Sequence, residues 1–235
     1  MHSILLLPGL ASDATLWRDQ IPALSARHRV TVSDVHFLFD TLPEMAAALL
    51  VEHPGTHVLV GSSMGGMLAL EAWRQAPSRV SALALLGSTA RPDTAELIRL
   101  RSQACELFEL GRMDEVLRAN LGFVFHPRTE GNAELTATYL EFVRRAGAEQ
   151  LIRQNRAVMA RRDFRPLLRQ IECPLLVMCG QSDLLTPPEC SEEIAAAVPH
   201  SRLELLAECG HLLTMEQPAR VNALLLDWLG GIRAP

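Results

Sequence analysis

Short apolar runs bounded by turn residues alternate along the chain with segments in which apolar residues recur at helical spacing. Uninterrupted apolar runs of this length are typical of parallel strands that are buried on both faces. The pattern predicts strands at residues 3–7, 29–33, 57–61, 80–86, 174–179 and 202–206. The intervening segments predict helices at residues 14–24, 42–52, 64–75, 188–198 and 218–229.

Alternating strands and helices predict an α/β fold, with a mostly parallel sheet of about six strands and helices on both faces. Right-handed crossovers place the carboxyl ends of all the strands at one edge of such a sheet, which we call the carboxyl edge. Ligands of parallel sheets bind at this edge, near the point where the strand order reverses. We therefore expect the chemistry in the loops that follow the strands.

The alternation stops after residue 90, where the chain predicts several amphipathic helices and no strand. We expect these helices at residues 94–110, 114–121, 133–146 and 149–160. We interpret residues 90–165 as a helical cap inserted over the carboxyl edge of the sheet. Residues 1–89 and 166–235 then form the α/β core.

The composition is that of an ordinary globular protein, since 49% of the 235 residues are hydrophobic and 21% are charged. The formal net charge is −5 and no basic block occurs, so we expect no nucleic-acid partner. An arginine cluster lies in the cap, and a solvated helical face is its more typical explanation. The alternative is that one of these arginines binds a substrate carboxylate. The cluster consists of Arg144, Arg145, Arg153, Arg156, Arg161, Arg162 and Arg165.

Targeting and cofactor signals are absent from the sequence pattern. The five cysteines form no CxxC pair and no zinc-finger spacing, so we expect no metal. The opening MHSILLLPGL has neither a charged segment nor a long apolar run, which predicts no signal peptide and no membrane span. Free thiols then favour a cytoplasmic protein. No dinucleotide loop occurs, and GSSMGG lacks the Lys-Ser/Thr ending of a phosphate loop, so we expect no cofactor.

The same GSSMGG stretch lies where a predicted strand gives way to a predicted helix. A sharp strand-to-helix turn needs nearly side-chain-free residues on both sides of its apex, which is the Gly-x-Ser-x-Gly pattern. Gly61 and Gly65 make Ser63 the apex, and Ser62 fills a tolerated position. Backbone N–H groups and the following helix dipole favour negative charge there. A bare match is more often an ordinary turn, so a nucleophilic Ser63 requires partners.

A serine nucleophile needs a base and an acid that orients the base. Among eight histidines, His211 follows the last predicted strand, beside Gly210, in a loop at the carboxyl edge. His36 also follows a strand but lies near the flank of the sheet, and His126 lies in the cap. His211 is therefore the candidate base.

Asp183 is the candidate acid, because it follows the penultimate predicted strand in GQSDLLTPP. Aspartate in such a loop is commonly only a turn former. The order Ser, Asp, His, with each residue at the carboxyl end of a strand, is far rarer than any one of these motifs. We rank Asp34, Asp93 and Glu208 below Asp183 as competing acids.

An oxyanion hole would complete this site. One donor is the backbone N–H of the residue after the nucleophile, Met64. The second is expected in LLLPGLASD, where Gly9 lets the chain pass close and the N–H of Leu10 points into the site. Cys209 lies near His211 in the sequence, but we expect it to be a buried filler rather than a thiol nucleophile.

Together, LLLPGL, GSSMGG, GQSDLLTPP and GHLLTMEQP resemble the α/β-hydrolase fold superfamily. With the strands around them they cover the chain outside the cap, and they are most similar to small capped esterases, enol-lactonases and carbon–carbon-bond hydrolases. The resemblance implies Ser63 as nucleophile, His211 as base and Asp183 as its partner. It also implies backbone oxyanion donors at Leu10 and Met64.

Three features depart from the superfamily pattern. Pro8-Gly9 stands where many relatives have His-Gly, so a side chain that often orders the oxyanion loop is missing. The apolar stretch SDVHFLFDTL replaces a Gly-rich turn, and we expect it to line the pocket or pack beneath it. The predicted sheet starts directly with the strand before the oxyanion loop, without the N-terminal hairpin of relatives.

The leading hypothesis is a serine hydrolase that cleaves small carboxylic esters through an acyl-enzyme, with a small-molecule acyl substrate and no membrane partner. A lactonase, a thioesterase, a carbon–carbon hydrolase or a perhydrolase would use the same groups, because fold does not determine reaction. A non-catalytic ligand-binding protein is the third hypothesis. It is less favoured because all three triad positions are filled.

Overall fold

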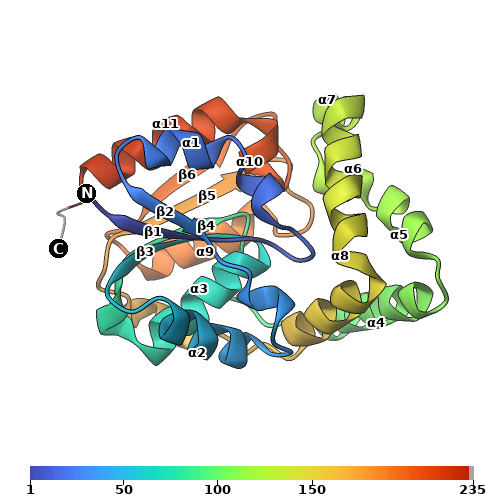
Figure 1. Ribbon diagram of the computed structural model, residues 1–235, viewed down its shortest axis with the longest axis horizontal. Helices are drawn as coiled ribbons and strands as arrows, with labels where there is room; N and C mark the ends of the chain where they lie inside the picture. Colours follow the sequence, from blue (N-terminus) through green and yellow to red (C-terminus); the bar gives the residue numbers. More distant parts are fainter. Residues whose placement is uncertain (233–235) are drawn as a thin grey trace.

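The structure is a computed structural model that describes residues 1–232 (Figure 1). Six parallel strands form one sheet in the order β2-β1-β3-β4-β5-β6, which confirms the predicted α/β fold. The order reverses between β1 and β3, which are hydrogen-bonded neighbours. The strands are β1 (Ser3–Leu7), β2 (Arg29–Val32), β3 (His57–Ser62), β4 (Val80–Leu86), β5 (Leu175–Gly180) and β6 (Arg202–Leu206).

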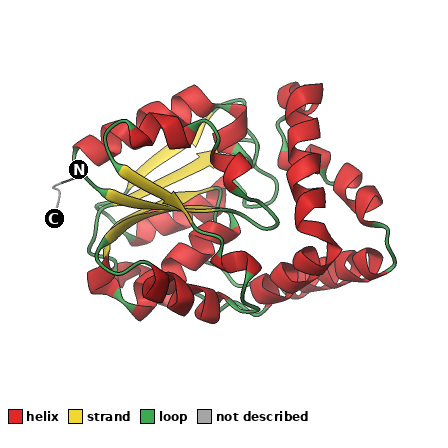
Figure 2. Cartoon of the chain, in the orientation of Figure 1, coloured by secondary structure: helices red, strands yellow, loops and turns green. Residues whose placement is uncertain are grey.

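Helices cover both faces of the sheet, as the buried strands require (Figure 2). Alternate strand residues point to opposite faces, so that Ile4 and Leu6 belong to one buried cluster and Leu5 and Leu7 to the other. The first cluster packs against α1 (Gln20–Ser25) and α11 (Pro218–Gly230). The second packs against α2 (Leu42–Glu52), α3 (Met64–Gln75) and α9 (Pro188–Ala197).

Between β4 and β5 the chain forms helices that stand beside the sheet (Figure 1). A residue of α8, Gly147, has non-helical dihedral angles (φ 83°, ψ 168°), so this helix is kinked where the sequence predicts a break. The segment contains α4 (Ala95–Glu109), α5 (Met113–Ala119), α6 (Leu121–Val124), α7 (Pro127–Glu130) and α8 (Ala133–Met159).

One predicted helix, at residues 14–24, is wrong as a single element. The chain forms a short 3₁₀ helix, η1 (Ala14–Trp17), and then starts α1 afresh. Asp13 caps η1 by accepting a hydrogen bond from the Thr15 N–H at 2.8 Å. The apolar side chains of both pieces still reach the core, which explains why their spacing looked continuous. A further 3₁₀ helix, η2 (Val35–Phe37), forms after β2.

Candidate active site

Ser63 stands at a strained turn between β3 and α3. Its backbone angles are φ 53° and ψ −117°, a combination that side chains disfavour. The two flanking glycines make the turn possible: a Cβ on Gly61 would lie 2.2 Å from the Gly65 carbonyl oxygen, and a Cβ on Gly65 would lie 2.0 Å from that of Leu7. The predicted Gly-x-Ser-x-Gly geometry is therefore present.

The turn after β4 holds the backbone of Ser63 from the side. The Ser63 N–H donates to the Leu86 carbonyl at 2.8 Å, and the Ser88 hydroxyl donates to the Ser63 carbonyl at 2.8 Å. The side chain of Ser63 is partly exposed, whereas Ser62 is only 2% exposed. Of the two adjacent serines, Ser63 is thus the one that a substrate can reach.

Asp183 and His211 form a buried pair. His211 Nδ1 lies 2.8 Å from Asp183 Oδ2, and the two residues are 5% and 1% exposed. Asp183 Oδ1 accepts the Leu185 and Thr186 N–H groups, each at 2.9 Å, and Oδ2 also accepts the Thr186 hydroxyl at 2.9 Å. Burial by itself would raise the pKa of Asp183, but the facing imidazole and these hydrogen bonds outweigh it and lower that pKa.

The turn after β4 also connects Ser63 with the Asp183–His211 pair. Gly87 has a positive φ of 52°, and a Cβ there would lie 3.2 Å both from Asp183 Oδ2 and from the His211 carbonyl oxygen. Leu86 and Ser88, its chain neighbours, hold Ser63. The three predicted residues therefore all lie against one turn, Asp183 with its side chain and Ser63 and His211 with their backbone. Within residues 1–232, however, no hydrogen bond joins the Ser63 hydroxyl to the His211 ring.

The loop after β1 approaches Ser63 from the opposite side. A Cβ on Gly9 would lie 3.3 Å from the Ser63 Cβ, so this glycine permits the close approach that the sequence predicts. In the described part of the chain, neither the Leu10 N–H nor the Met64 N–H has a hydrogen-bond acceptor. Both N–H groups are available to a ligand.

Two contacts tie the His211 loop to the helices beside the sheet. The His211 N–H donates to the Val124 carbonyl at 2.9 Å. Glu216 accepts the Gly210 N–H through Oε1 and the His126 N–H through Oε2, each at 2.9 Å. Burial raises the pKa of Glu216. No spacing in the sequence marks this carboxylate, Ser88 or Thr186, so none of the three could be predicted as part of the site.

The residues that compete with Asp183 as the acid, or with Ser63 as the nucleophile, are paired with arginine, exposed or fully buried. Asp93 is paired with Arg161 at 2.7 Å, and Glu208 is paired with Arg128. Asp34 is exposed. Cys209 is fully buried, and burial raises the pKa of its thiol, so it is not a poised nucleophile.

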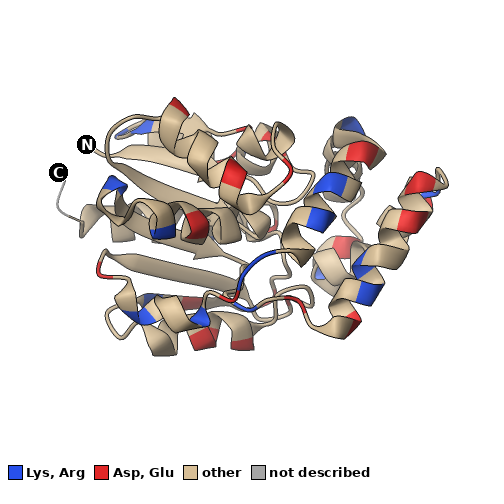
Figure 3. Ribbon diagram, turned by 90° about the horizontal axis from the view of Figure 1, so that it is seen from below, with Lys and Arg blue, Asp and Glu red and all other residues tan. Residues whose placement is uncertain are grey.

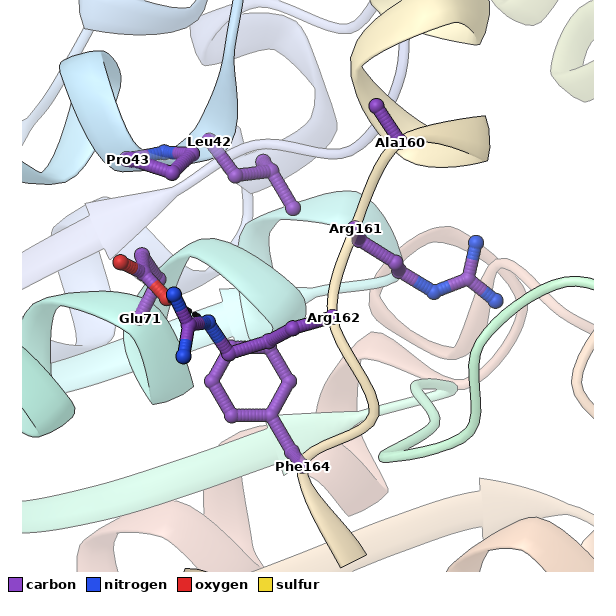
Figure 4. A pocket seen from close by; sticks show the side chains of 7 residues that line it. All are labelled: Leu42, Pro43, Glu71, Ala160, Arg161, Arg162 and Phe164. Carbon is purple, nitrogen blue, oxygen red and sulfur yellow. Dashed lines mark ion pairs between the residues drawn. The ribbon is translucent and has the colours of Figure 1, made fainter.

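Every arginine of the cluster has a carboxylate partner, and acidic and basic positions are interspersed along the ribbon in this part of the molecule (Figure 3). The Arg162 guanidinium reaches back to Glu71 of α3 at 3.3 Å, across a small pocket (Figure 4). Five of the seven arginines are exposed, Arg153 is half-buried and Arg161 is buried, so most of the cluster is solvated, with each guanidinium paired to a carboxylate. The pairs are Arg144–Asp114, Arg145–Asp13, Arg153–Asp40, Arg156–Glu109, Arg161–Asp93, Arg162–Glu71 and Arg165–Asp163.

No group of three or more His, Cys, Asp or Glu side chains is arranged to hold a metal ion in residues 1–232. None of the helices described has both the length and the apolar character that crossing a membrane requires.

Comparison with known proteins places these features in a family. Residues 36–218 match the family model described as alpha/beta hydrolase fold. A protein of Serratia proteamaculans (strain 568) named "Putative carbamate hydrolase RutD" is 28% identical over 97% of this chain and 90% of its own length.

Two solved structures superpose closely on this one. A thermophilic esterase from Thermogutta terrifontis, with malate bound, has a TM-score of 0.90 and 27% identity over 100% of this chain and 91% of its own. An enol-lactonase from Burkholderia xenovorans LB400 has a TM-score of 0.88 and 22% identity over 97% of this chain and 91% of its own. The second likeness concerns the fold alone.

Proposed function

Because the chain belongs to the alpha/beta hydrolase fold family, we propose that it is a serine hydrolase that cleaves small carboxylic esters. The observation that carries the proposal is the buried hydrogen bond of 2.8 Å between Asp183 and His211, beside a strained and partly exposed Ser63. Similarity to a thermophilic esterase at 27% identity adds support.

In the proposed reaction, the Ser63 oxygen attacks the ester carbonyl carbon while His211 Nε2 takes the hydroxyl proton. The carbonyl electron pair moves onto oxygen, and its return expels the alcohol, which receives the proton from His211. Water then attacks the acyl-enzyme in the same way and releases the acid. Asp183 stays ionised, keeps the Nδ1 proton of His211 in place and stabilises the imidazolium.

The negative oxygen of each tetrahedral intermediate would be bound by the N–H groups of Met64 and Leu10. Met64 begins α3, where the helix dipole adds to the stabilisation of an anion. The missing Ser63–His211 hydrogen bond agrees with the behaviour of enzymes without substrate, in which such bonds are often long and tighten when the substrate binds.

A second candidate reaction is carbamate hydrolysis, which the likeness to the Serratia protein favours. Ser63 would attack the carbamate carbonyl in the same way, and His211 would protonate the leaving amine. Parallel assays with p-nitrophenyl acetate, a simple lactone, a thioester and an alkyl carbamate would rank these substrates.

The test compares Ser63→Ala with Ser62→Ala, its matched neighbour. With p-nitrophenyl acetate we expect Ser63→Ala to lower kcat by at least about 10³-fold and Ser62→Ala to retain most of the activity. A fluorophosphonate should label the wild-type protein at Ser63, located by mass spectrometry of peptides. Equal activities of the two variants, or a label on another residue, would refute the assignment.

A further inference from the structure

The backbone that carries the Leu10 N–H is a tight turn from Gly9 to Ser12. The Ser12 N–H donates to the Gly9 carbonyl at 3.1 Å. Ala11, the third residue of this turn, has a φ of 53°, a position where turns normally require glycine. A non-glycine residue persists in such a conformation only when its surroundings hold it there.

The side chain of Gln154 supplies one of these restraints from α8, 143 residues further along the chain. Its Oε1 accepts the Ala11 N–H at 2.6 Å, and its Nε2 donates to the His36 carbonyl at 2.9 Å. The two partners assign the orientation of the amide, because one is a donor and the other an acceptor. Gln154 is 0% exposed, so solvent offers no substitute for either bond.

His36 supplies the second restraint from η2. Its Nε2 lies 2.7 Å from the Ser12 carbonyl oxygen, so the ring must carry a proton on Nε2 and donate it. The residue is 1% exposed, and burial lowers the pKa of the imidazole. Gln154 and His36 therefore hold opposite ends of one short segment, the N–H of Ala11 and the carbonyl of Ser12.

We propose that Gln154 and His36 are positioning residues that aim the Leu10 N–H at the reacting carbonyl oxygen. The inference rests on the proposed hydrolase function. The two side chains would order the oxyanion loop from other elements, because Pro8 stands directly before Gly9 where many relatives have a histidine. This arrangement also links the placement of α8 to the strength of the oxyanion hole.

Gln150 provides the matched control, because it is the same residue type one helical turn earlier in α8. Its Nε2 donates to the Phe37 carbonyl at 3.2 Å, so it joins the helix to η2 without reaching the Gly9–Ser12 turn. Gln154→Met and Gln150→Met remove these bonds with side chains of similar length. Both variants weaken the docking of α8 against η2, but only Gln154→Met frees the Ala11 N–H, so a purely structural role would show as a loss of stability rather than as a fall in kcat at constant KM.

The experiment measures kcat and KM with p-nitrophenyl acetate, the rate of fluorophosphonate labelling of Ser63, and inhibition by a trifluoromethyl ketone. We expect Gln154→Met to lower kcat and the labelling rate by about 10- to 100-fold at nearly unchanged KM. Inhibition by the ketone, whose adduct carries an oxyanion, should weaken by a similar factor. Gln150→Met should leave all of these within about twofold of the wild type.

His36→Phe is the second variant, and it decides the question if Gln154→Met does not fold. It should show the same fall in kcat at constant KM, and the double variant should lose less than the product of the two losses, because both act on one turn. Rates equal to those of Gln150→Met, or a raised KM at constant kcat, would overturn the positioning role. Either result would leave the hydrolase proposal intact as long as Ser63→Ala is inactive and Ser63 is labelled.

Discussion

The strain at Ser63 predicts that removing its Cβ stabilises the protein. The angles φ 53° and ψ −117° are close to the mirror image of an allowed conformation, so that glycine adopts them without penalty. Ser63→Ala keeps the Cβ and the strain, whereas Ser63→Gly relieves it. Both variants lack the hydroxyl, so a difference in stability between them reports the backbone alone.

The expected magnitude follows from two opposing quantities. A non-glycine residue at such a position costs about 1–3 kcal/mol. Glycine loses more conformational entropy on folding, which costs about 0.5–1 kcal/mol. Ser63→Gly should therefore exceed Ser63→Ala by about 0.5–2 kcal/mol in free energy of unfolding, or by about 1–8 °C in Tm.

Urea unfolding at pH 7, followed by circular dichroism, measures this difference. Ser102 in α4 is the control position, because glycine in the interior of a helix is less stable than alanine by about 1 kcal/mol. Replacing alanine by glycine should thus raise the free energy of unfolding at position 63 and lower it at position 102. If Ser63→Gly is no more stable than Ser63→Ala, the strain argument is wrong.

Two further predictions concern Asp183 and Gly65. Asp183→Asn should lower kcat by about 10⁴-fold. Folding lowers the pKa of Asp183, so the ionised carboxylate stabilises the folded protein. This stabilisation should be complete above the ordinary aspartate pKa of about 4 and should be lost as the pH falls through the lower pKa of the folded state. The difference in free energy of unfolding between wild type and Asp183→Asn should therefore narrow in acid. Gly65→Ala places a Cβ 2.0 Å from the Leu7 carbonyl oxygen and should cost about 3 kcal/mol or more, measured by urea unfolding. Gly230→Ala, with nothing within 4 Å of its added Cβ, should be neutral or stabilising, and a Gly65→Ala variant as stable as that one would contradict the packing described.

Local patterns of apolar and polar residues predict much of the fold. The strands β1, β4 and β6 and the helices α2 and α3 begin and end where the sequence predicts, because strands buried on both faces and amphipathic helices each leave a periodic signature. The turn at Ser63 is equally local, since its glycines are needed within two residues of the apex. The local pattern was misleading at residues 14–24, where the apolar residues of η1, capped by Asp13, and of the separate helix α1 follow one continuous helical spacing.

The sequence by itself determined the candidate Ser63, Asp183 and His211, because parallel strands bring their carboxyl ends to one edge whatever lies between them. Only the tertiary structure decided what holds these groups in place. Gln154 meets Ala11 across 143 residues, and six of the seven clustered arginines pair with a carboxylate on another segment of the chain. Hydrogen bonds between residues so far apart leave no periodicity or spacing in the chain, since they depend on how the helices dock against the sheet and against one another.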